Sequence, residues 1–311
     1  MSIYITIDGG TTNTRVTLIK NRDLLDGIKL SIGARKSIEN KELLKSEIKR
    51  AINMLMERNS VCPKDIIAIL ASGMITSEFG LCHLEHIPTP TGIKELYEGI
   101  KRIRLPEISE IPFAFIRGVR ISDSSFEKLD VMRGEETELM GIINPDFGEC
   151  IYILPGSHSK IIKVDAEGRI VDFSTQMTGE MIAALSQGTI LKDAVDLNIS
   201  EINNDYLLRG YDCAVREGIN KSLFKVRVLK NFCGSDKVET YSFFLGVVLS
   251  GEIKEIIENT VKTVVLGGKV QIKNAMSIIL KSRSDKSIII LDEDAVDKSI
   301  SLGAIRIYEN I

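Results

Sequence analysis

The sequence IDGGTTNTR, residues 7 to 15, most constrains what this chain can fold into. It lies between two apolar runs that are rich in β-branched residues, residues 3 to 7 and residues 16 to 19. Two such runs separated by glycines predict a β-hairpin in which Asp8 ends the first strand. Two interpretations of the tip are open. It is an ordinary turn capped by Asp8, or it is a loop that binds phosphate through backbone N–H groups and threonine hydroxyls while Asp8 holds hydrated Mg²⁺.

The composition indicates a globular protein that acts on a small molecule. With 311 residues, 44% of them hydrophobic, the chain is long enough for two domains. A formal net charge of −3 argues against a general nucleic-acid or membrane-surface partner. The sequence has no bilayer-length apolar run and no signal-peptide pattern at its start, which predicts a cytoplasmic location. The five cysteines are scattered without a CxxC pair, so we expect reduced thiols and no zinc site.

Alternating strand and helix patterns predict an α/β fold. Apolar residues recur at helical spacing between residues 43 and 55, and a buried strand is expected at residues 66 to 70, followed by the loop ASGMITSEFG. A helix is expected at residues 242 to 259 and a strand at residues 287 to 291. A polar stretch before residue 131 indicates a hinge, so the predicted domains are residues 1–133 and 134–311.

The second half of the chain repeats the pattern of the first hairpin. Strands are expected at residues 151 to 154 and 161 to 164, and the turn PGSHSK separates them. Further along, a strand is followed by the glycine-containing sequence LGGKVQIKNAM, and the chain ends with DKSISLGAIRI before its last residues. The pattern predicts one phosphate-binding hairpin in each domain.

The order of these motifs resembles the sugar kinase, Hsp70 and actin superfamily of ATPases. Within it, the sequences VMRGEETELMG (131 to 141), LPGSHSK (154 to 160), MTGEM (177 to 181) and SGMITSEFG are most similar to the 2-dehydro-3-deoxygalactonokinase family. The resemblance implies a two-domain, actin-like and ribonuclease H-like α/β fold with a nucleotide cleft between the domains. It also implies an ATP- and Mg²⁺-dependent kinase, which phosphorylates the terminal (6-) hydroxyl of 2-dehydro-3-deoxy-D-galactonate or a similar sugar acid.

The resemblance assigns the nucleotide-binding residues to three loops. Asp8 would hold Mg²⁺, and the other expected contacts to ATP are Gly10, Thr11, Thr12 and Asn13 in the first loop, Gly156, Ser157, His158 and Lys160 in the second, and Gly267 and Gly268 in the adenosine motif. Glycine lets the backbone approach a phosphate closely, and hydroxyl, imidazole and ammonium groups add donors.

Two adjacent glutamates are candidates for the general base. Glu135 falls on the catalytic carboxylate of the Gly-Asp-Gln-Gln run in glycerol-type sugar kinases, so we assign the base to Glu135 in preference to Glu136. Adjacent helical residues point about 100° apart, so only one of them is expected to reach the acceptor hydroxyl. Carboxylates are also favoured at helix starts for electrostatic reasons, and this alternative stays open.

The expected substrate residues lie around the same sequences. Arg133 would bind the substrate carboxylate or the transferred phosphoryl group, because a planar guanidinium suits either. Gly73, Met74 and Ser77 would form the substrate loop, and Thr178, Gly179 and Glu180 would face it from the second domain. The chain has no tryptophan and carries Gly9, Leu81 and Ile161 where family members have one, which indicates an acceptor pocket of different shape.

Three alternative functions are open on the sequence. One is another carbohydrate or pantothenate kinase of the superfamily. A second is an actin-like or Hsp70-like ATPase that drives assembly or partner binding, although the Arg-Gly-Glu-Glu run favours a kinase. A third is a sugar-sensing regulator, which the absence of a helix-turn-helix before residue 3 disfavours. The expected partner is a small-molecule sugar acid, with no nucleic acid and no membrane, and a homodimer is one of the open quaternary states.

Overall fold

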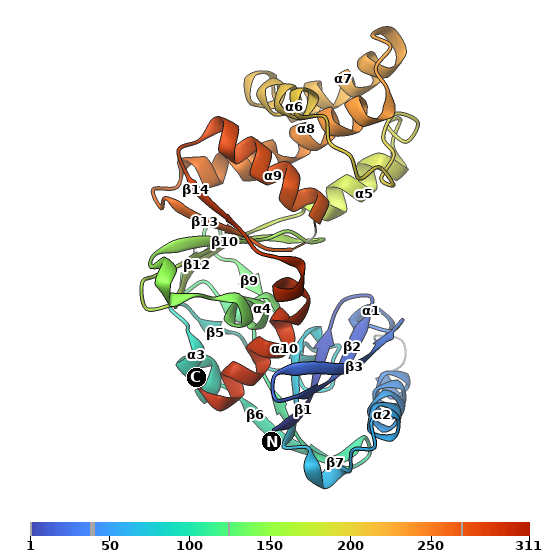
Figure 1. Ribbon diagram of the computed structural model, residues 1–311, viewed down its shortest axis with the longest axis vertical. Coiled ribbons are helices and arrows are strands. Elements are labelled where there is room, and N and C mark those ends of the chain that lie inside the picture. The colour runs from blue at the N-terminus through green and yellow to red at the C-terminus, as the bar shows by residue number, and fades with distance from the viewer. Residues whose placement is uncertain (1, 38–40, 124, 269) are drawn as a thin grey trace. The chain divides into compact units, whose positions relative to one another are not determined.

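The first predicted hairpin lies in a six-stranded sheet of the computed structural model, which describes residues 2–37, 41–123, 125–268 and 270–311 (Figure 1). The strand order is β3-β2-β1-β4-β7-β6. Strands β1 and β4 are parallel, as are β4 and β7, and the outer pairs are antiparallel. The strands of this sheet are β1 (Ile3–Gly9), β2 (Thr14–Lys20), β3 (Asp23–Leu30), β4 (Ala68–Gly73), β6 (Lys101–Leu105) and β7 (Ser109–Phe115).

Side-chain alternation along β1 decides which face of the sheet carries the polar groups. Ile3, Ile5 and Ile7 face a core that includes the buried side of helix α2 (Lys41–Arg58). The intervening residues face helix α10 (Glu293–Glu309), where Thr6 Oγ1 lies 2.7 Å from Ser301 Oγ. Asp8 continues this second series, so its carboxylate lies on the α10 side of the sheet.

Short elements complete the first half of the chain. They are α1 (Ala34–Ser37), η1 (Pro63–Asp65), η2 (Met74–Thr76), β5 (Ile87–Pro88), α3 (Ile93–Glu98), β8 (Val119–Arg120), β9 (Val131–Met132), α4 (Glu135–Ile142) and η3 (Pro145–Phe147). Strands β5, β8 and β9 form a separate three-stranded sheet. It places the end of β9 directly before the first residues of α4.

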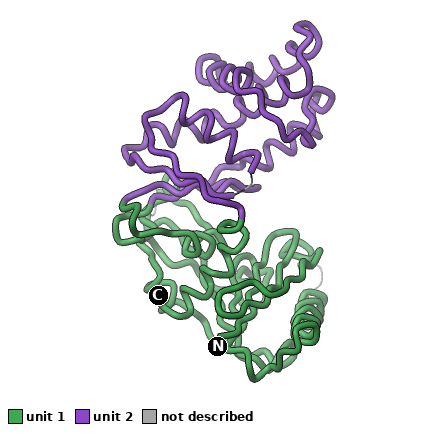
Figure 2. Tube along the Cα trace, viewed as in Figure 1, with its two compact units in different colours: residues 1–148, 164–173, 294–311 green, residues 149–163, 174–293 purple. Residues whose placement is uncertain are grey.

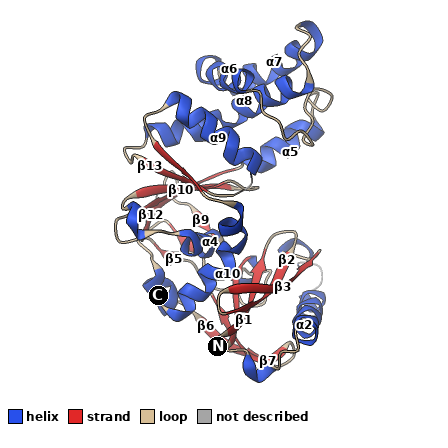
Figure 3. Cartoon of the chain, viewed as in Figure 1, coloured by secondary structure: helices blue, strands red, loops and turns tan. Residues whose placement is uncertain are grey.

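A second, five-stranded sheet carries the second glycine loop, with the order β12-β11-β10-β13-β14. Its strands are β10 (Cys150–Leu154), β11 (Ser159–Val164), β12 (Ile170–Gln176), β13 (Thr263–Leu266) and β14 (Ser287–Ile290). The helices of this half, coloured in Figure 3, are α5 (Thr178–Gly188), α6 (Asn204–Glu217), α7 (Ile219–Phe232), α8 (Lys237–Glu258) and α9 (Val270–Arg283). Strands β10 and β13 run parallel, as do β13 and β14.

The chain divides into two units whose segments alternate along the sequence (Figure 2). Unit 1 comprises residues 1–148, 164–173 and 294–311, and unit 2 comprises residues 149–163 and 174–293. The segment 164–173 joins unit 1 because Thr91 and Ile170 exchange two backbone hydrogen bonds, of 3.0 and 2.8 Å. This division therefore differs from the predicted boundary between residues 133 and 134.

Close helix packing explains why α4 and α10 both belong to unit 1. A Cβ atom built on Gly303 would lie 1.8 Å from Thr137 O, and one built on Gly141 would lie 1.9 Å from Ser299 O. Only glycine permits so close an approach of two helix backbones. The glycines at these two positions thus allow helix α10 to pack closely against helix α4, which begins with Glu135.

Most expected elements are present, with shifted ends. The strand predicted at residues 66 to 70 is β4, Ala68–Gly73, so the prediction began two residues early and missed that Gly73 pairs with Gly9. The helix predicted from residue 242 begins at Lys237, because Asp236 caps it by accepting a hydrogen bond from Glu239 N at 2.9 Å. Among the described helices, none is long and apolar enough to span a membrane.

Candidate active site

The first loop is a tight turn that uses part of its own backbone. Gly10 N donates to Asn13 O at 2.8 Å, so the backbone N–H of Gly10 already has a partner within the loop. The carbonyl oxygens of Gly10 and Thr11 accept hydrogen bonds from the first N–H groups of α1, at 3.1 and 3.0 Å. Thr11 and Thr12 are exposed and Asn13 is half-buried. The groups that this loop presents to solvent are therefore mainly hydroxyls.

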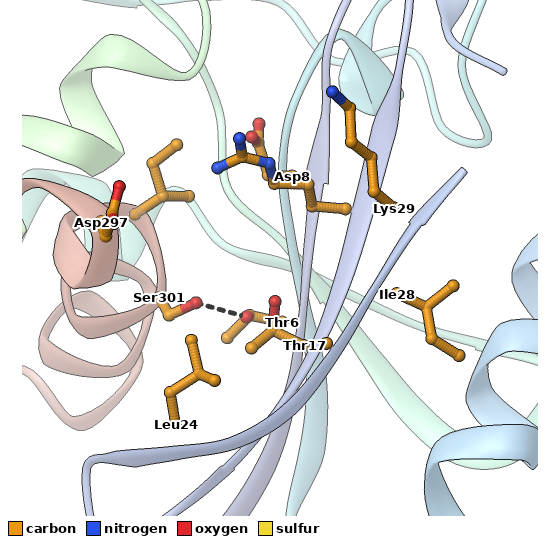
Figure 4. Close-up of a pocket in the computed structure, with 11 residues that line it drawn as sticks. Thr6, Asp8, Thr17, Leu24, Ile28, Lys29, Asp297 and Ser301 are labelled. Atoms are coloured by element: carbon orange, nitrogen blue, oxygen red, sulfur yellow. Dashed lines mark hydrogen bonds between the residues drawn. The ribbon is translucent and has the colours of Figure 1, made fainter. Parts of the chain in front are cut away.

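Asp8 lines a cavity of about 400 Å³ on the α10 face of the sheet (Figure 4). The other lining residues come from β1, β2, β3 and α10: Thr6, Arg15, Thr17, Leu24, Gly27, Ile28, Lys29, Asp297, Ile300 and Ser301. Burial raises the pKa of Asp8 to about 6, Arg15 opposes this shift, and Glu135 adds to it. A carboxyl group with such a pKa is one that a cation would help to ionise.

Two glycines with positive φ bring the Glu135 run to Asp8. Gly73 has φ +79° and Gly134 has φ +116°. A Cβ atom on Gly73 would lie 3.3 Å from Asp8 Oδ1, and one on Gly134 would lie 3.2 Å from Gly73 Cα. The end of β4 and the start of α4 are thus in direct contact next to the Asp8 carboxylate. Side chains at either glycine would be strained and would separate these elements.

The two adjacent glutamates at the start of α4 have different environments. Glu136 is buried, and its carboxylate accepts hydrogen bonds from Gly134 N at 3.0 and 2.8 Å and from Thr137 Oγ1 at 3.0 Å. Burial, and next the charge of Glu135, raise the pKa of Glu136 to about 8. Glu135 is half-buried, and its Oε2 accepts from Arg133 N at 3.0 Å. Glu136 therefore stabilises the turn into α4, and Glu135 is the more accessible carboxylate.

Arg133 is held by the substrate loop predicted from the sequence. Its guanidinium donates to Thr76 O at 2.7 Å, to Thr76 Oγ1 at 2.6 Å and to Leu84 O at 2.9 Å, and lies 3.4 Å from His86 Nδ1. Arg133 thus ties the segment after β4 to the start of α4. The Ser77 hydroxyl donates to Met74 O at 2.7 Å and closes the η2 turn, while Met74 is partly exposed.

The Asp8 carboxylate is a donor of the kind that suits a magnesium ion, and Arg15 and Lys29 line the same cavity. Mg²⁺ prefers carboxylate and water oxygens and is commonly held by one or two carboxylates together with substrate phosphates. Within residues that the structure describes, no three Asp, Glu, His or Cys side chains form a complete set of metal ligands. The chemistry of the donors therefore fits a site in which Asp8 supplies a single protein carboxylate and waters or phosphates supply the rest.

The second loop, between β10 and β11, exposes only part of its predicted donor set. Gly156 is half-buried, and Ser157 and His158 are exposed. Lys160 is only 4% exposed, and its Nζ donates to Thr175 Oγ1 at 2.5 Å. The lysine lies within strand β11 and is engaged there, so the loop presents Gly156 to His158 as its accessible residues.

Two other predicted segments pack against this second loop within unit 2. Gly268 has φ +71°, and a Cβ atom there would lie 2.7 Å from Pro155 O, while Gly267 N donates to Ile153 O at 2.9 Å. On another side, Cβ atoms on Gly179 would lie 2.4 Å from Gly156 O. The second phosphate motif and the adenosine motif are therefore neighbours, and the start of α5 contacts the same loop.

The residues of the MTGEM sequence, 177 to 181, lie next to the second loop. Thr178 is buried and donates to Glu252 Oε2 at 2.7 Å. Glu180 is exposed, its N–H donates to Ser157 O at 3.2 Å, and its carboxylate lies 3.3 Å from His158 Nε2. The substrate role predicted for Thr178, Gly179 and Glu180 stays a prediction. Within unit 2, Gly179 and Glu180 contact the second phosphate loop, and Thr178 bonds to Glu252 of α8.

Sequence reasoning gave no role to Arg15, Glu138 or Glu252, which the structure places next to predicted site residues. Arg15 pairs with Asp8 across the antiparallel hairpin, a register that a two-strand pattern could have suggested. Burial, and next the charges of Glu135 and Asp8, raise the pKa of Glu138 to about 8. Glu138 lies three residues after Glu135 on the same helix, and this spacing is the sequence signal that places the two side chains on one face. Glu252 lies in an apolar helix, and its polarity there was a signal that we did not use.

The fold of this chain is shared with solved structures of other proteins. A Sinorhizobium meliloti structure assigned as a 2-dehydro-3-deoxygalactonokinase is similar over 99% of this chain and 98% of its own, with a TM-score of 0.79 and 21% sequence identity. The (R)-2-hydroxyglutaryl-CoA dehydratase component A of Acidaminococcus fermentans is similar over 100% of this chain and 99% of its own, with a TM-score of 0.53 and 15% identity. These similarities confirm the predicted α/β fold class.

The family follows from the sequence match. The model of the 2-keto-3-deoxy-galactonokinase family matches residues 8–301. The chain therefore belongs to this family, and the resemblance predicted from its motifs is confirmed. It is also similar to DgoK1 of Rhizobium meliloti (strain 1021), assigned as a 2-dehydro-3-deoxygalactonokinase, with 28% identity over 195 residues. That match covers 62% of this chain and 59% of DgoK1, so it spans about three fifths of the relative.

Proposed function

We propose that this protein is an ATP- and Mg²⁺-dependent kinase that phosphorylates the terminal (6-) hydroxyl of 2-dehydro-3-deoxy-D-galactonate or a similar sugar acid in the cytoplasm. The observation that carries the proposal is the contact between Gly73 and Gly134, which sets the Glu135 run beside Asp8. Family membership supports the reaction class, and the net charge of −3 is consistent with a small-molecule substrate instead of a nucleic acid or a membrane.

Unit 1 would supply the carboxylates that act on the acceptor and the metal. Mg²⁺-ATP, when bound, supplies the phosphoryl group and neutralises part of its charge. Asp8 would contact the metal through water, and Thr11 and Thr12 would donate hydroxyl hydrogen bonds to phosphate oxygens. Glu135 would accept the proton of the acceptor hydroxyl at its carboxylate, as a general base positioned by Arg133 N.

Unit 2 would hold the nucleotide. Gly156, Ser157 and His158 are the accessible residues of the second loop, and they offer backbone, hydroxyl and imidazole donors to phosphates. Gly268, packed against Pro155, leaves backbone free of side-chain bulk where the adenosine motif is expected. This assignment differs from the sequence prediction in one respect, because the buried Lys160 would support strand β11 and would not contact phosphate directly.

The test is a coupled assay of ADP release with Mg²⁺-ATP and a panel of acceptors. The panel contains 2-dehydro-3-deoxy-D-galactonate, other 2-keto-3-deoxy sugar acids, neutral sugars and pantothenate. We expect weak turnover without an acceptor and strong stimulation by a 2-keto-3-deoxy sugar acid, with NMR placing the phosphate on the terminal carbon. Greater stimulation by pantothenate or a neutral sugar would replace the proposed acceptor. Stimulation only by a partner protein or by polymerisation would replace the kinase by an actin-like or Hsp70-like ATPase.

A further inference from the structure

Glu252 is a buried carboxylate in the apolar helix α8. It is 3% exposed and lies among the buried residues of that helix. Its Oε1 accepts a hydrogen bond from Ser159 Oγ and its Oε2 accepts one from Thr178 Oγ1, both at 2.7 Å. Burial raises the pKa of Glu252, and the two hydroxyl donors oppose that rise. A carboxylate is rarely kept in such a place unless its hydrogen bonds are needed.

The two hydroxyls belong to the first residues of two different elements, strand β11 and helix α5. Ser159 follows His158 at the end of the second phosphate loop, and Thr178 precedes Gly179 at the start of α5. The second phosphate loop and the start of α5 also meet directly, because a Cβ atom on Gly179 would lie 2.8 Å from Ser157 Cα. Glu252 therefore bridges the two segments by one carboxylate oxygen each.

Glu255, one turn further along α8, provides an internal comparison. Its carboxylate accepts hydrogen bonds from Ser174 Oγ and from Gln176 Nε2, both in strand β12. The same helix thus has two glutamates that accept hydrogen bonds from side chains of neighbouring segments. Both partners of Glu255 lie in β12, whereas Glu252 joins the first residue of β11, which directly follows the second phosphate loop, to the first residue of α5. A purely structural role for such helix-to-sheet contacts would make the two glutamates equivalent.

We propose that Glu252 is a positioning residue for nucleotide binding, which fixes the second phosphate loop and the start of α5 as one preformed surface. The inference rests on the proposed kinase function, since it assigns that loop to ATP. Without the carboxylate, Ser159 and Thr178 would lose their common partner, and the loop would have to be ordered when the nucleotide binds. Ordering on binding weakens affinity, so the loss should fall on the ATP dissociation constant more than on the acceptor KM.

The experiment measures ATP binding and turnover separately in matched variants. Isothermal titration calorimetry with Mg²⁺ and a non-hydrolysable ATP analogue, without acceptor, gives the nucleotide Kd of the wild type, Glu252→Ala, Glu252→Gln and Glu255→Ala. We expect Glu252→Ala to raise this Kd by about tenfold, which corresponds to about 1.4 kcal/mol. Glu252→Gln should restore most of the affinity, because its amide can accept one hydroxyl proton and donate to the other oxygen. Glu255→Ala should bind like the wild type.

The result that overturns the inference is equal nucleotide affinity in folded Glu252→Ala and Glu255→Ala. If Glu252→Ala does not fold, Ser159→Ala and Thr178→Val remove one bond each, and unchanged Kd values in both would contradict the inference in the same way. Failure of the kinase function has a different signature. In that case the wild type binds the nucleotide, the nucleotide Kd values of the variants follow the expected order, and no acceptor raises turnover.

Discussion

The loop between β1 and β2 in unit 1 and the loop between β10 and β11 in unit 2 both connect neighbouring strands, and their supports differ. In the first loop, backbone groups hold one another, as in the Gly10 N to Asn13 O bond. In the second, a side chain from a distant helix, Glu252, holds the strand residue that follows the loop. The Asp8 carboxylate precedes the first loop and Glu135 lies close to it, whereas the exposed side chains of the second loop are a hydroxyl and an imidazole.

The difference suggests a division of labour between the two units. Glu135 is close enough to Asp8 to add to the rise of the Asp8 pKa, an arrangement suited to a metal ion and a general base. The accessible residues of the second loop offer backbone, hydroxyl and imidazole donors and lie near Gly268, which suits an anionic nucleotide. The exposed Glu180 carboxylate lies 3.3 Å from His158 Nε2 of this loop. On this account, changes in unit 1 should affect kcat, and changes around the second loop should affect nucleotide affinity.

The largest expected effect is that of Asp8→Asn. This substitution keeps the size of the side chain and removes the charge that would attract Mg²⁺, so we expect kcat to fall by about 100-fold or more. Steady-state kinetics at saturating ATP and acceptor measures the effect, and circular dichroism checks the fold. If the folded variant turned over at nearly the wild-type rate, Asp8 would cap the turn without contacting a metal.

Gly268→Ala tests whether the second loop and the adenosine motif determine nucleotide affinity. The added Cβ would meet Pro155 at 2.7 Å in a backbone conformation with φ +71°, so the second loop and the adenosine motif must separate. We expect the Kd for ATP to rise by about tenfold while kcat at saturating ATP changes little. Gly148→Ala is a matched control, because Gly148 also has positive φ, +61°, and a Cβ there would meet nothing within 4 Å. Equal losses of ATP affinity in both variants would indicate general backbone strain.

A smaller effect is expected in the pH dependence of stability. Burial raises the pKa of Glu136 to about 8 in the folded protein, above the value of about 4.3 expected in the unfolded chain. The folded state therefore binds the proton more tightly, and this contribution to stability is present at low pH and is lost as the pH rises through about 8. Glu136→Gln should flatten the fall of Tm between about pH 5 and pH 8, whereas an unchanged slope would show that other groups cause the fall.

Much of the fold could be predicted because local patterns determine it. The β-branched runs around residues 3 to 7 and 151 to 154 form strands β1 and β10, and the 3.6-residue period around residue 48 forms α2. Helices α6 and α7 were not predicted. Contacts with α8 and its neighbours support them, and such contacts leave only weak signals in a single sequence.

The candidate site could be predicted in its loops and not in its long-range contacts. Glycines and hydroxyls mark both phosphate loops locally. The approach of Asp8 to Glu135, more than a hundred residues away, depends on how Gly73 and Gly134 pack, which no local pattern encodes. Lys160 was predicted to contact phosphate because it follows the loop, but it belongs to β11, where it is buried.

The most direct test of the account compares Glu135→Gln with Glu136→Gln in both kcat and ATP affinity. Glu135 is the accessible carboxylate beside Asp8, so Glu135→Gln should lower kcat by about 10²- to 10⁴-fold with little change in the ATP Kd. Glu136 serves the turn into α4, so Glu136→Gln should lower kcat far less. The reverse order of kcat defects in folded variants would assign the base to Glu136, and small, equal defects would mean that neither glutamate is the base.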